Sequence, residues 1–182
     1  MKLSEFAKPI VAKNHFIKAS LGGFQGSGKS LTATKFIIGV YKDLKLSKPI
    51  LIIDNEKGGR FLINQFKKAG IKALIKDSKQ LADVREAFRF VQNGEIDFLF
   101  VDSLTKIYYQ YVRDYKKKNN RQSMFLQDWG KLLPAWQEEF SDIFVEVEGN
   151  IVFTGRGGFE YEKEEDQKDE QGNIIEKGQF VK

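Results

Sequence analysis

The sequence predicts an α/β fold in which a mainly parallel central sheet carries helices on both faces. Short apolar runs alternate along the chain with segments whose apolar residues recur at helical spacing. The runs at 50–54 and 96–101 are continuous, which is typical of strands buried on both faces of a parallel sheet. Alternating strands and helices favour parallel pairing through right-handed crossovers.

The predicted elements follow one another regularly. Strands are expected at residues 15–21, 50–54, 71–75, 96–101 and 150–154. Helices are expected at 29–44, at 59–69, around the apolar series Leu81, Val84, Phe88 and Val91, from Leu104 to Tyr115, and from Pro134 onward with the core face Trp136, Phe140, Ile143, Phe144 and Val147. A hairpin is expected near the C-terminus, with segments 160–170 and 174–181 around Gln171-Gly172-Asn173.

Composition limits the class of protein. The chain has 182 residues, of which 41% are hydrophobic and 30% charged, so one globular domain with a substantial core is expected. The absence of cysteine excludes disulfides and Cys-ligated zinc. No run of about 18 apolar residues is present, and the first residues lack the apolar segment of a secretory signal, so we expect no membrane span and a cytoplasmic location.

Charge is unevenly distributed. Residues 159–182 contain four lysines against eight acidic residues, a net charge of −4. Since the whole chain has a net charge of +5, the first 158 residues carry +9. We therefore divide the chain into a core, 1–158, and an acidic C-terminal hairpin, 159–182, whose end has no obvious terminal cap, as in a truncated chain. A basic body is compatible with a polyanionic partner such as nucleic acid.

The segment 23–30 reads Gly-Phe-Gln-Gly-Ser-Gly-Lys-Ser and satisfies the pattern G-x-x-x-x-G-K-[ST]. Glycines let successive backbone N–H groups turn toward phosphate oxygens, and the following helix directs its positive dipole end at them. In this pattern Lys29 neutralises the β- and γ-phosphates and Ser30 ligates Mg²⁺. The alternative is a chance match, which the flanking strand and helix disfavour. The residues expected to bind ATP or a similar triphosphate are Gly23, Phe24, Gln25, Gly26, Ser27, Gly28, Lys29, Ser30 and Leu31.

Two acidic residues at strand ends indicate hydrolysis. Asp102 ends an apolar strand, the place from which a Walker B carboxylate holds Mg²⁺ beside the phosphate loop. The alternative is a helix N-cap, a position that Ser103 also suits. Hydrolysis further needs a group that orients the attacking water, and Glu56 can supply it from a neighbouring strand. Its alternative is a surface acid in a turn with Gly58-Gly59.

These motifs resemble those of the RecA-like family of P-loop ATPases. Residues 52–56, Ile-Ile-Asp-Asn-Glu, resemble the Asp-x-Glu motif of that family, and residues 100–104, Phe-Val-Asp-Ser-Leu, resemble its Walker B segment. The resemblance extends over roughly residues 16–156 and is strongest to the small RecA-like core ATPases encoded by bacteriophages, which act in single-strand annealing and recombination.

The resemblance has implications for chemistry and partners. It implies that Glu56 is the catalytic base and that the protein uses ATP and Mg²⁺, producing ADP and phosphate slowly or under stimulation by DNA. It also implies a homo-oligomer in the host cytoplasm. Single-stranded DNA and phage or host single-strand-binding or replication proteins are the implied partners.

The end of the last strand departs from the family pattern. RecA-like recombinases usually have Gln near this point, where this chain has Thr154-Gly155-Arg156. We expect Thr154 to sense the γ-phosphate. Arg156 has four readings: contact with phosphate in the same chain, contact with a neighbouring subunit's nucleotide, contact with DNA, or a solvated side chain in a Gly-rich loop.

A basic segment follows the Walker B helix. In RecA-like proteins the corresponding loop faces single-stranded DNA, and basic and aromatic residues together give sequence-tolerant, salt-sensitive binding. The alternative is a solvated helix end. The residues expected to contact DNA are Arg113, Lys116, Lys117, Lys118 and Arg121.

Two other functions compete with a DNA-coupled ATPase. One is an ATP-dependent loader or switch that acts on a protein partner such as a helicase. The other is a small-molecule phosphotransferase, which the small number of arginines disfavours because such enzymes usually carry an Arg-bearing lid.

Overall fold

The computed structural model describes residues 16–157 and the short segments 162–163, 167–168, 174–176 and 180–181. A five-stranded sheet forms the centre, with strand order β1-β5-β4-β2-β3 and parallel pairing throughout. The strands are β1 (Lys18–Gly23), β2 (Ile50–Asp54), β3 (Ala73–Asp77), β4 (Phe98–Asp102) and β5 (Asn150–Arg156). The predicted α/β class and parallel sheet are confirmed.

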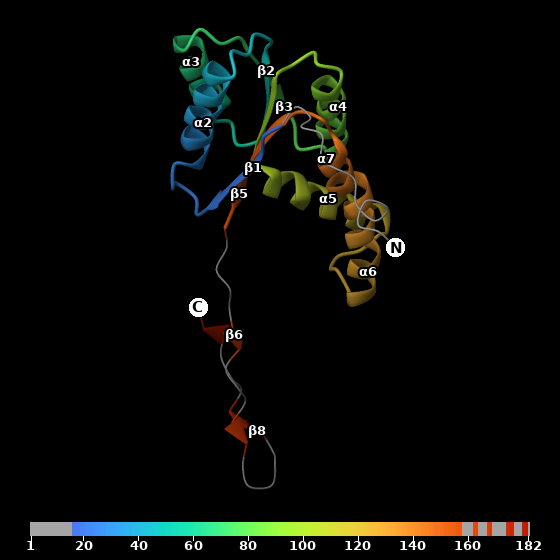
Figure 1. Ribbon diagram of the computed structural model, residues 1–182. Coiled ribbons are helices and arrows are strands. Elements are labelled where there is room, and N and C mark those ends of the chain that lie inside the picture. Colours follow the sequence, from blue (N-terminus) through green and yellow to red (C-terminus); the bar gives the residue numbers. More distant parts are fainter. Residues whose placement is uncertain (1–15, 158–161, 164–166, 169–173, 177–179, 182) are drawn as a thin grey trace, which may run out of the picture.

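Helices cover both faces of the sheet (Figure 1). On one face α2 (Lys29–Asp43) and α3 (Gly59–Lys68) enclose an apolar cluster that includes Ile37, Phe66 and Phe100. On the other, α4 (Leu81–Gln92), α5 (Leu104–Lys118) and the segment from residue 126 to 146 enclose a second cluster around Phe88, Ile107 and Phe153. Successive side chains of a strand point to opposite faces, so the continuous apolar runs of β2 and β4 supply both clusters.

The segment after α5 differs from the sequence prediction. Helix α6 (Leu126–Trp136) begins eight residues before Pro134, and a π-helical turn, η1 (Gln137–Ser141), joins it to α7 (Asp142–Glu146). The prediction that Pro134 opens a helix was therefore wrong. Asp128 supplies the start instead, because its carboxylate accepts the backbone N–H of Phe125 at 3.0 Å. The predicted core face is confirmed, since Trp136, Phe140, Ile143, Phe144 and Val147 all belong to the second cluster.

The C-terminal segment pairs with itself. Two antiparallel pairs, β6 (Glu162–Lys163) with β9 (Phe180–Val181) and β7 (Gln167–Lys168) with β8 (Ile174–Glu176), follow the pattern of the predicted hairpin. The predicted turn at 171–173 lies outside the described residues. Within the described part of the chain, no helix is both long and apolar enough to cross a membrane.

Parallel strands place all their carboxyl ends at one edge of the sheet. Register pairs Asp54 with Asp102, and Gly23 with Arg156. The phosphate loop after β1 opens onto the same edge. This edge is therefore where the predicted site residues meet, as is usual for ligand sites in open α/β sheets.

Candidate active site

The phosphate loop has the backbone form that anion binding requires. Gly26 and Gly28 both have φ of 81°, in the left-handed region that glycine adopts without strain. Gly28 is the N-cap of α2, so the first N–H groups of that helix face the loop interior. The ammonium group of Lys29 lies over the loop and donates to the carbonyl of Phe24 at 2.6 Å. The predicted loop is thus a cradle of backbone donors with a lysine across it.

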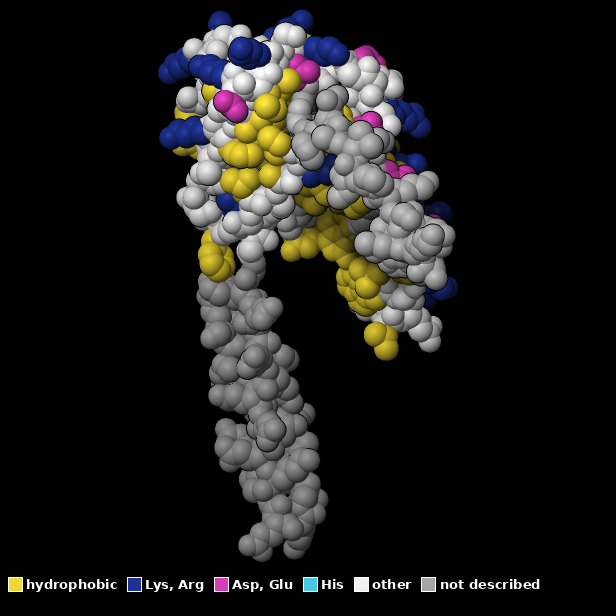
Figure 2. Space-filling view, viewed as in Figure 1, with side chains coloured by type: hydrophobic (Ala, Val, Ile, Leu, Met, Phe, Trp, Pro, Cys, Tyr) yellow, Lys and Arg dark blue, Asp and Glu magenta, His cyan; other side chains and the backbone are white. Residues whose placement is uncertain are grey.

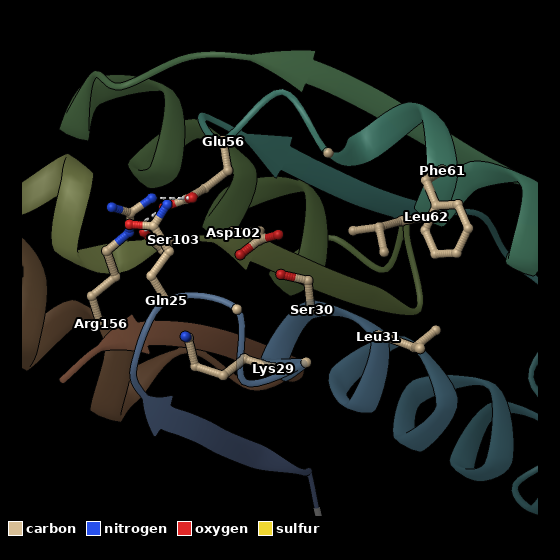
Figure 3. Close-up of a pocket in the computed structure, with 13 residues that line it drawn as sticks. Gln25, Lys29, Ser30, Leu31, Glu56, Phe61, Leu62, Asp102, Ser103 and Arg156 are labelled. Atoms are coloured by element: carbon tan, nitrogen blue, oxygen red, sulfur yellow. Dashed lines mark hydrogen bonds and ion pairs between the residues drawn. The ribbon is translucent and has the colours of Figure 1, made fainter.

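A cavity of about 390 Å³ lies between this loop and the ends of β2, β4 and β5 (Figure 3). In Figure 3 the Ser30 hydroxyl and the Asp102 carboxylate point toward each other across it. A hydroxyl and a carboxylate beside a phosphate cradle fit Mg²⁺, which prefers few protein oxygens together with phosphates and waters. The cavity is lined by Gln25, Gly26, Gly28, Lys29, Ser30, Leu31, Glu56, Gly58, Phe61, Leu62, Asp102, Ser103 and Arg156.

Asp102 is held from behind by Thr154. The Thr154 hydroxyl donates to Oδ1 of Asp102, and both side chains are buried. Thr154 is not among the residues that line the cavity. The geometry therefore favours a positioning role, in which Thr154 orients the candidate metal-binding carboxylate, over the direct γ-phosphate contact expected from the sequence.

Asp54 organises the loop that carries Glu56. Its two carboxylate oxygens accept the backbone N–H groups of Glu56 at 2.8 Å and of Gly59 at 2.7 Å. Gly59 permits this approach, since a Cβ there would lie 2.2 Å from Cδ1 of Ile75 and 2.7 Å from Oδ2 of Asp54. Asp54 thus shapes the turn that directs Glu56 into the cavity.

Glu56 is surrounded by donors. Arg156 Nε donates to Oε1 at 2.9 Å, and Arg156 Nη2 donates to Oε2. The hydroxyl of Ser103 donates to Oε1 at 3.0 Å, and the Lys106 ammonium lies 3.5 Å from the same oxygen. Burial by itself raises the pKa of Glu56, but the hydrogen bonds from Arg156 and Ser103 and the charge of Lys106 outweigh it and hold that pKa below the ordinary glutamate value.

The structure bears on two further predictions. Ser103 is the N-cap residue of α5, as the sequence suggested, but its hydroxyl makes no cap bond and donates to Glu56 instead. Arg156 lines the cavity and pairs with Glu56, so the reading of it as a solvated side chain was wrong. The hydrogen bonds with Glu56 raise the pKa of Arg156 above the ordinary arginine value. The backbone N–H of Arg156 donates to the Thr105 hydroxyl at 2.9 Å.

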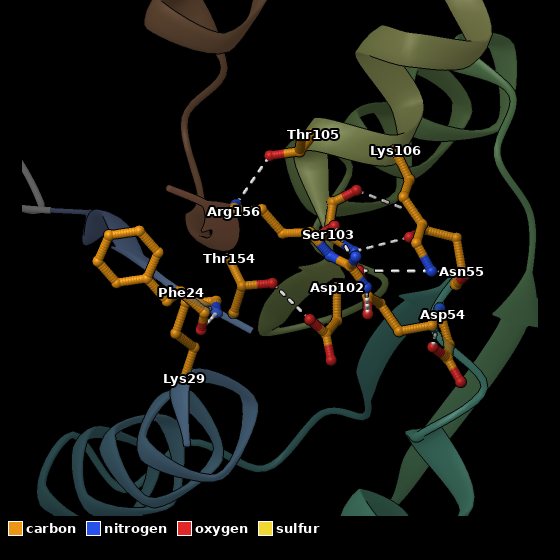
Figure 4. Close-up of polar contacts among 11 residues, drawn as sticks. Phe24, Lys29, Asp54, Asn55, Asp102, Ser103, Thr105, Lys106, Thr154 and Arg156 are labelled. Atoms are coloured by element: carbon orange, nitrogen blue, oxygen red, sulfur yellow. Dashed lines mark hydrogen bonds and ion pairs between the residues drawn. The ribbon is translucent and has the colours of Figure 1, made fainter. Parts of the chain in front are cut away.

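Asn55 also belongs to the site, although the sequence did not single it out. This buried residue connects the ends of β2 and β4 through three hydrogen bonds, all near 2.9 Å, to the backbone of Asp102 and Ser103 (Figure 4). The signal was its place between Asp54 and Glu56, where a polar residue directly follows a buried strand. Such a residue needs partners for its amide.

The far end of the cavity is apolar. Leu31, Phe61 and Leu62 gather there, away from Lys29 and Arg156 (Figure 3). The cavity thus has one charged and one apolar end, as a ligand with phosphates and a flat base requires.

The predicted DNA-contacting segment is largely helical. Arg113, Lys116, Lys117 and Lys118 lie in the last turns of α5, where lysines also favour the negative end of the helix dipole. Of the two alternatives, an exposed loop and a helix end, the structure supports the helix end for these four residues. Arg121 does lie in the connecting loop, with its Nε 3.5 Å from Oδ1 of Asp128 and its guanidinium 5.5 Å from the Phe125 ring centroid.

Comparison with known proteins identifies the family. The sequence model of the AAA domain family matches residues 15–180. The chain belongs to the AAA domain family. A fold of this family with an intact phosphate loop is a P-loop ATPase fold, which supports nucleotide binding and hydrolysis.

Other comparisons are more distant. No curated protein matches the sequence. Among solved structures, the chain is similar to a KaiC-like protein from the hyperthermophilic archaeon Pyrococcus horikoshii, at 19% identity and a TM-score of 0.48. The match covers 76% of this chain and 60% of that one.

Proposed function

We propose that the protein hydrolyses ATP in this cavity and couples the nucleotide state to binding of single-stranded DNA. One observation carries the first half: Lys29, Ser30, Asp102 and Glu56, which come from three separate parts of the sequence, converge on a single cavity. Each of these side chains bears a functional group that phosphoryl transfer to water requires beside the phosphates.

The four residues divide the work by chemistry. Lys29 would neutralise the β- and γ-phosphates, while Ser30 and Asp102 would hold Mg²⁺, which when bound would stabilise negative charge on the phosphate oxygens. Glu56 accepts a proton from the attacking water, a role for which its carboxylate must first leave part of its contact with Arg156. Arg156 lines the same cavity, so it can then turn to the developing charge on the phosphate.

Phosphate release tests the hydrolysis. The parent chain with ATP and Mg²⁺ should release phosphate, and chelation of Mg²⁺ should stop the release. Lys29→Ala should weaken binding of a fluorescent ATP analogue and remove turnover, whereas Lys35→Ala, an exposed lysine on the same helix, serves as the matched control and should behave as the parent. No phosphate release by the parent, with or without DNA, would refute the proposal.

The second half of the proposal depends on α5. This helix begins directly after Asp102-Ser103, and its Lys106 contacts both Glu56 and, at 3.2 Å, the carbonyl of Asn55. Its other end carries Lys117 and Lys118, both exposed. One rigid element therefore connects the candidate base with a basic surface, which is what coupling through a bound polyanion needs.

Exposed aromatic side chains also lie on α5 and at the start of α6. Tyr109 and Phe125 are each 57% exposed, and Figure 2 shows hydrophobic side chains gathered along α5 and α6. Exposed rings can stack on unpaired bases while lysines contact phosphates. In Figure 2 the basic side chains are otherwise spread over the outer surface of the helices, so we expect a small, salt-sensitive DNA contact rather than an extended one.

A charge-matched pair of variants tests this contact. Replacing Lys116, Lys117 and Lys118 by Glu should abolish binding of a single-stranded oligonucleotide at low salt. The control replaces three exposed lysines away from α5, namely Lys67 and Lys68 at the end of α3 and Lys72 before β3, by Glu, which changes the net charge equally. Equal losses in the two variants would show that only the net charge matters, and would refute the α5 site.

The biological setting follows from the resemblance alone and stays a proposal. We propose a phage-type recombination or annealing role for a homo-oligomer, with single-strand-binding or replication proteins as further partners. ATP turnover that an oligonucleotide leaves unchanged would favour a loader or switch acting on a protein instead.

A further inference from the structure

The amide of Asn55 continues a sheet ladder beyond the ends of its strands. Residues of β2 and β4 pair up to Asp54 and Asp102. One residue further, the Asn55 backbone N–H donates to the carbonyl of Asp102 at 2.9 Å. Its side chain then accepts the N–H of Ser103 and donates to the carbonyl of Ser103, each at 2.9 Å. A side-chain amide thus makes the two bonds that a neighbouring strand would make.

These hydrogen bonds lie where the segments that follow β2 and β4 must diverge. After Asn55 the chain turns to carry Glu56 over the cavity, and after Ser103 it enters α5. The hydrogen bonds of Asn55 hold the two departing segments together, and the Ser103 hydroxyl reaches Oε1 of Glu56 at 3.0 Å. Lys106, from the first turns of α5, adds a contact to the carbonyl of Asn55.

Asn55 does not itself line the phosphate cavity. It is buried, with 7% of its surface exposed, and every polar group named above is directed at the backbone of the β4–α5 junction or at Lys106. Any effect on chemistry must therefore pass through its neighbours Glu56 and Asp102.

We propose that Asn55 is a positioning residue for hydrolysis, which fixes Glu56 relative to the Asp102–Ser103 strand end. The inference rests on the proposed role of Glu56 as the base. Loss of the amide lets the Glu56 turn and the β4 end move apart, and small displacements of a catalytic group slow a reaction strongly while leaving remote binding contacts intact.

Asn150 provides a matched control. It too is a buried asparagine, with 8% exposure, that joins two segments by its amide, accepting the N–H of Ile17 at 3.0 Å and donating to the carbonyl of Asp97 at 2.9 Å. It lies at the first residue of β5, at the opposite edge of the sheet from the cavity. Any general cost of removing a buried amide is shared by the two positions.

The experiment measures kcat, the affinity for a fluorescent ATP analogue, and the melting temperature without nucleotide. It compares the parent with Asn55→Ala, Asn150→Ala, Glu56→Gln and the double variant Asn55→Ala/Glu56→Gln. Asn55→Ala should lower kcat by roughly 10- to 100-fold and leave nucleotide affinity within about threefold. Asn150→Ala should lower the melting temperature similarly and keep the parent kcat.

The double variant separates positioning from a general structural effect. If Asn55 acts through Glu56, its removal adds nothing once the base is gone, so the double variant should turn over as slowly as Glu56→Gln. Multiplied losses, or a fall in nucleotide affinity that parallels the fall in kcat, would overturn the inference, as would a parent-like kcat in Asn55→Ala.

Failure of the underlying function has a different signature. If Glu56→Gln turns over as fast as the parent, the base assignment fails, and with it the positioning role. If Glu56→Gln is slow and Asn55→Ala is not, only the inference about Asn55 fails.

Discussion

The guanidinium of Arg156 forms hydrogen bonds with both carboxylate oxygens of Glu56, with Nε donating to Oε1 at 2.9 Å and Nη2 to Oε2. These residues come from the ends of β5 and β2, on either side of the β4 end that carries Asp102. In this arrangement the candidate base is saturated with donors. In the proposed mechanism, Glu56 must first leave part of these contacts before it accepts a proton.

The first prediction concerns pH. Because Arg156 lowers the pKa of Glu56, the carboxylate stays charged to a lower pH than an ordinary glutamate, and the stability of the pair is lost only as pH falls through that lowered value. Arg156→Ala removes the hydrogen bonds and the charge that oppose the effect of burial on Glu56, so the pKa of Glu56 should rise. The acid limb of kcat/KM against pH should move to higher pH, whatever the absolute rate. An unchanged acid limb would show that Arg156 does not control this carboxyl.

The second prediction concerns the support of Asp102. Thr154→Val keeps the shape of the buried side chain and removes the hydroxyl that donates to Asp102. Loss of such a partner behind a metal ligand typically weakens metal affinity or activity by about 10- to 100-fold. We expect the Mg²⁺ concentration for half-maximal phosphate release to rise accordingly, with ATP-analogue affinity in the absence of Mg²⁺ unchanged. The same Mg²⁺ requirement in the variant and the parent would argue against this role.

The third prediction concerns the nucleotide base. Phe61 is 57% exposed at the apolar end of the cavity, where it can cover one face of a base. Phe61→Ala should weaken binding of ATP by about 1 to 3 kcal/mol, the usual worth of one stacked base, while binding of inorganic triphosphate stays the same. Phe36→Ala, on α2 and outside the cavity lining, is the control. Equal affinity of Phe61→Ala and the parent for ATP would place the base elsewhere.

Much of the fold was predictable because it depends on local patterns. The strand predicted from the continuous apolar run at 50–54 has the same bounds as β2, and Asp102 lies at the end of β4 as expected. Such strands can be read directly, since burial on both faces leaves no polar position inside them. Pro134 misled the helix prediction, because proline also occurs inside a helical segment when the neighbouring turns adjust, here with η1 directly after α6.

The candidate site was predictable in its residues but not in its contacts. Lys29, Ser30, Glu56 and Asp102 follow from motif spacing and from the common edge of a parallel sheet. The partner of each depends on tertiary placement: Arg156 is 100 residues from Glu56 along the chain, and Asn55 is 48 from Ser103. No periodicity in the sequence encodes such pairs, so the roles of Asn55, Ser103 and Arg156 required the structure.

The most direct test of the account is phosphate release by Glu56→Gln at saturating ATP and Mg²⁺, beside Glu86→Gln on the outer surface of α4 as the control. Replacement of the carboxylate by an amide removes the proton acceptor and keeps the shape of the side chain. We expect Glu56→Gln to bind the ATP analogue as tightly as the parent and to release phosphate at least about 100-fold more slowly. Parent-like release by Glu56→Gln would contradict the account, because the base would then have to be another group.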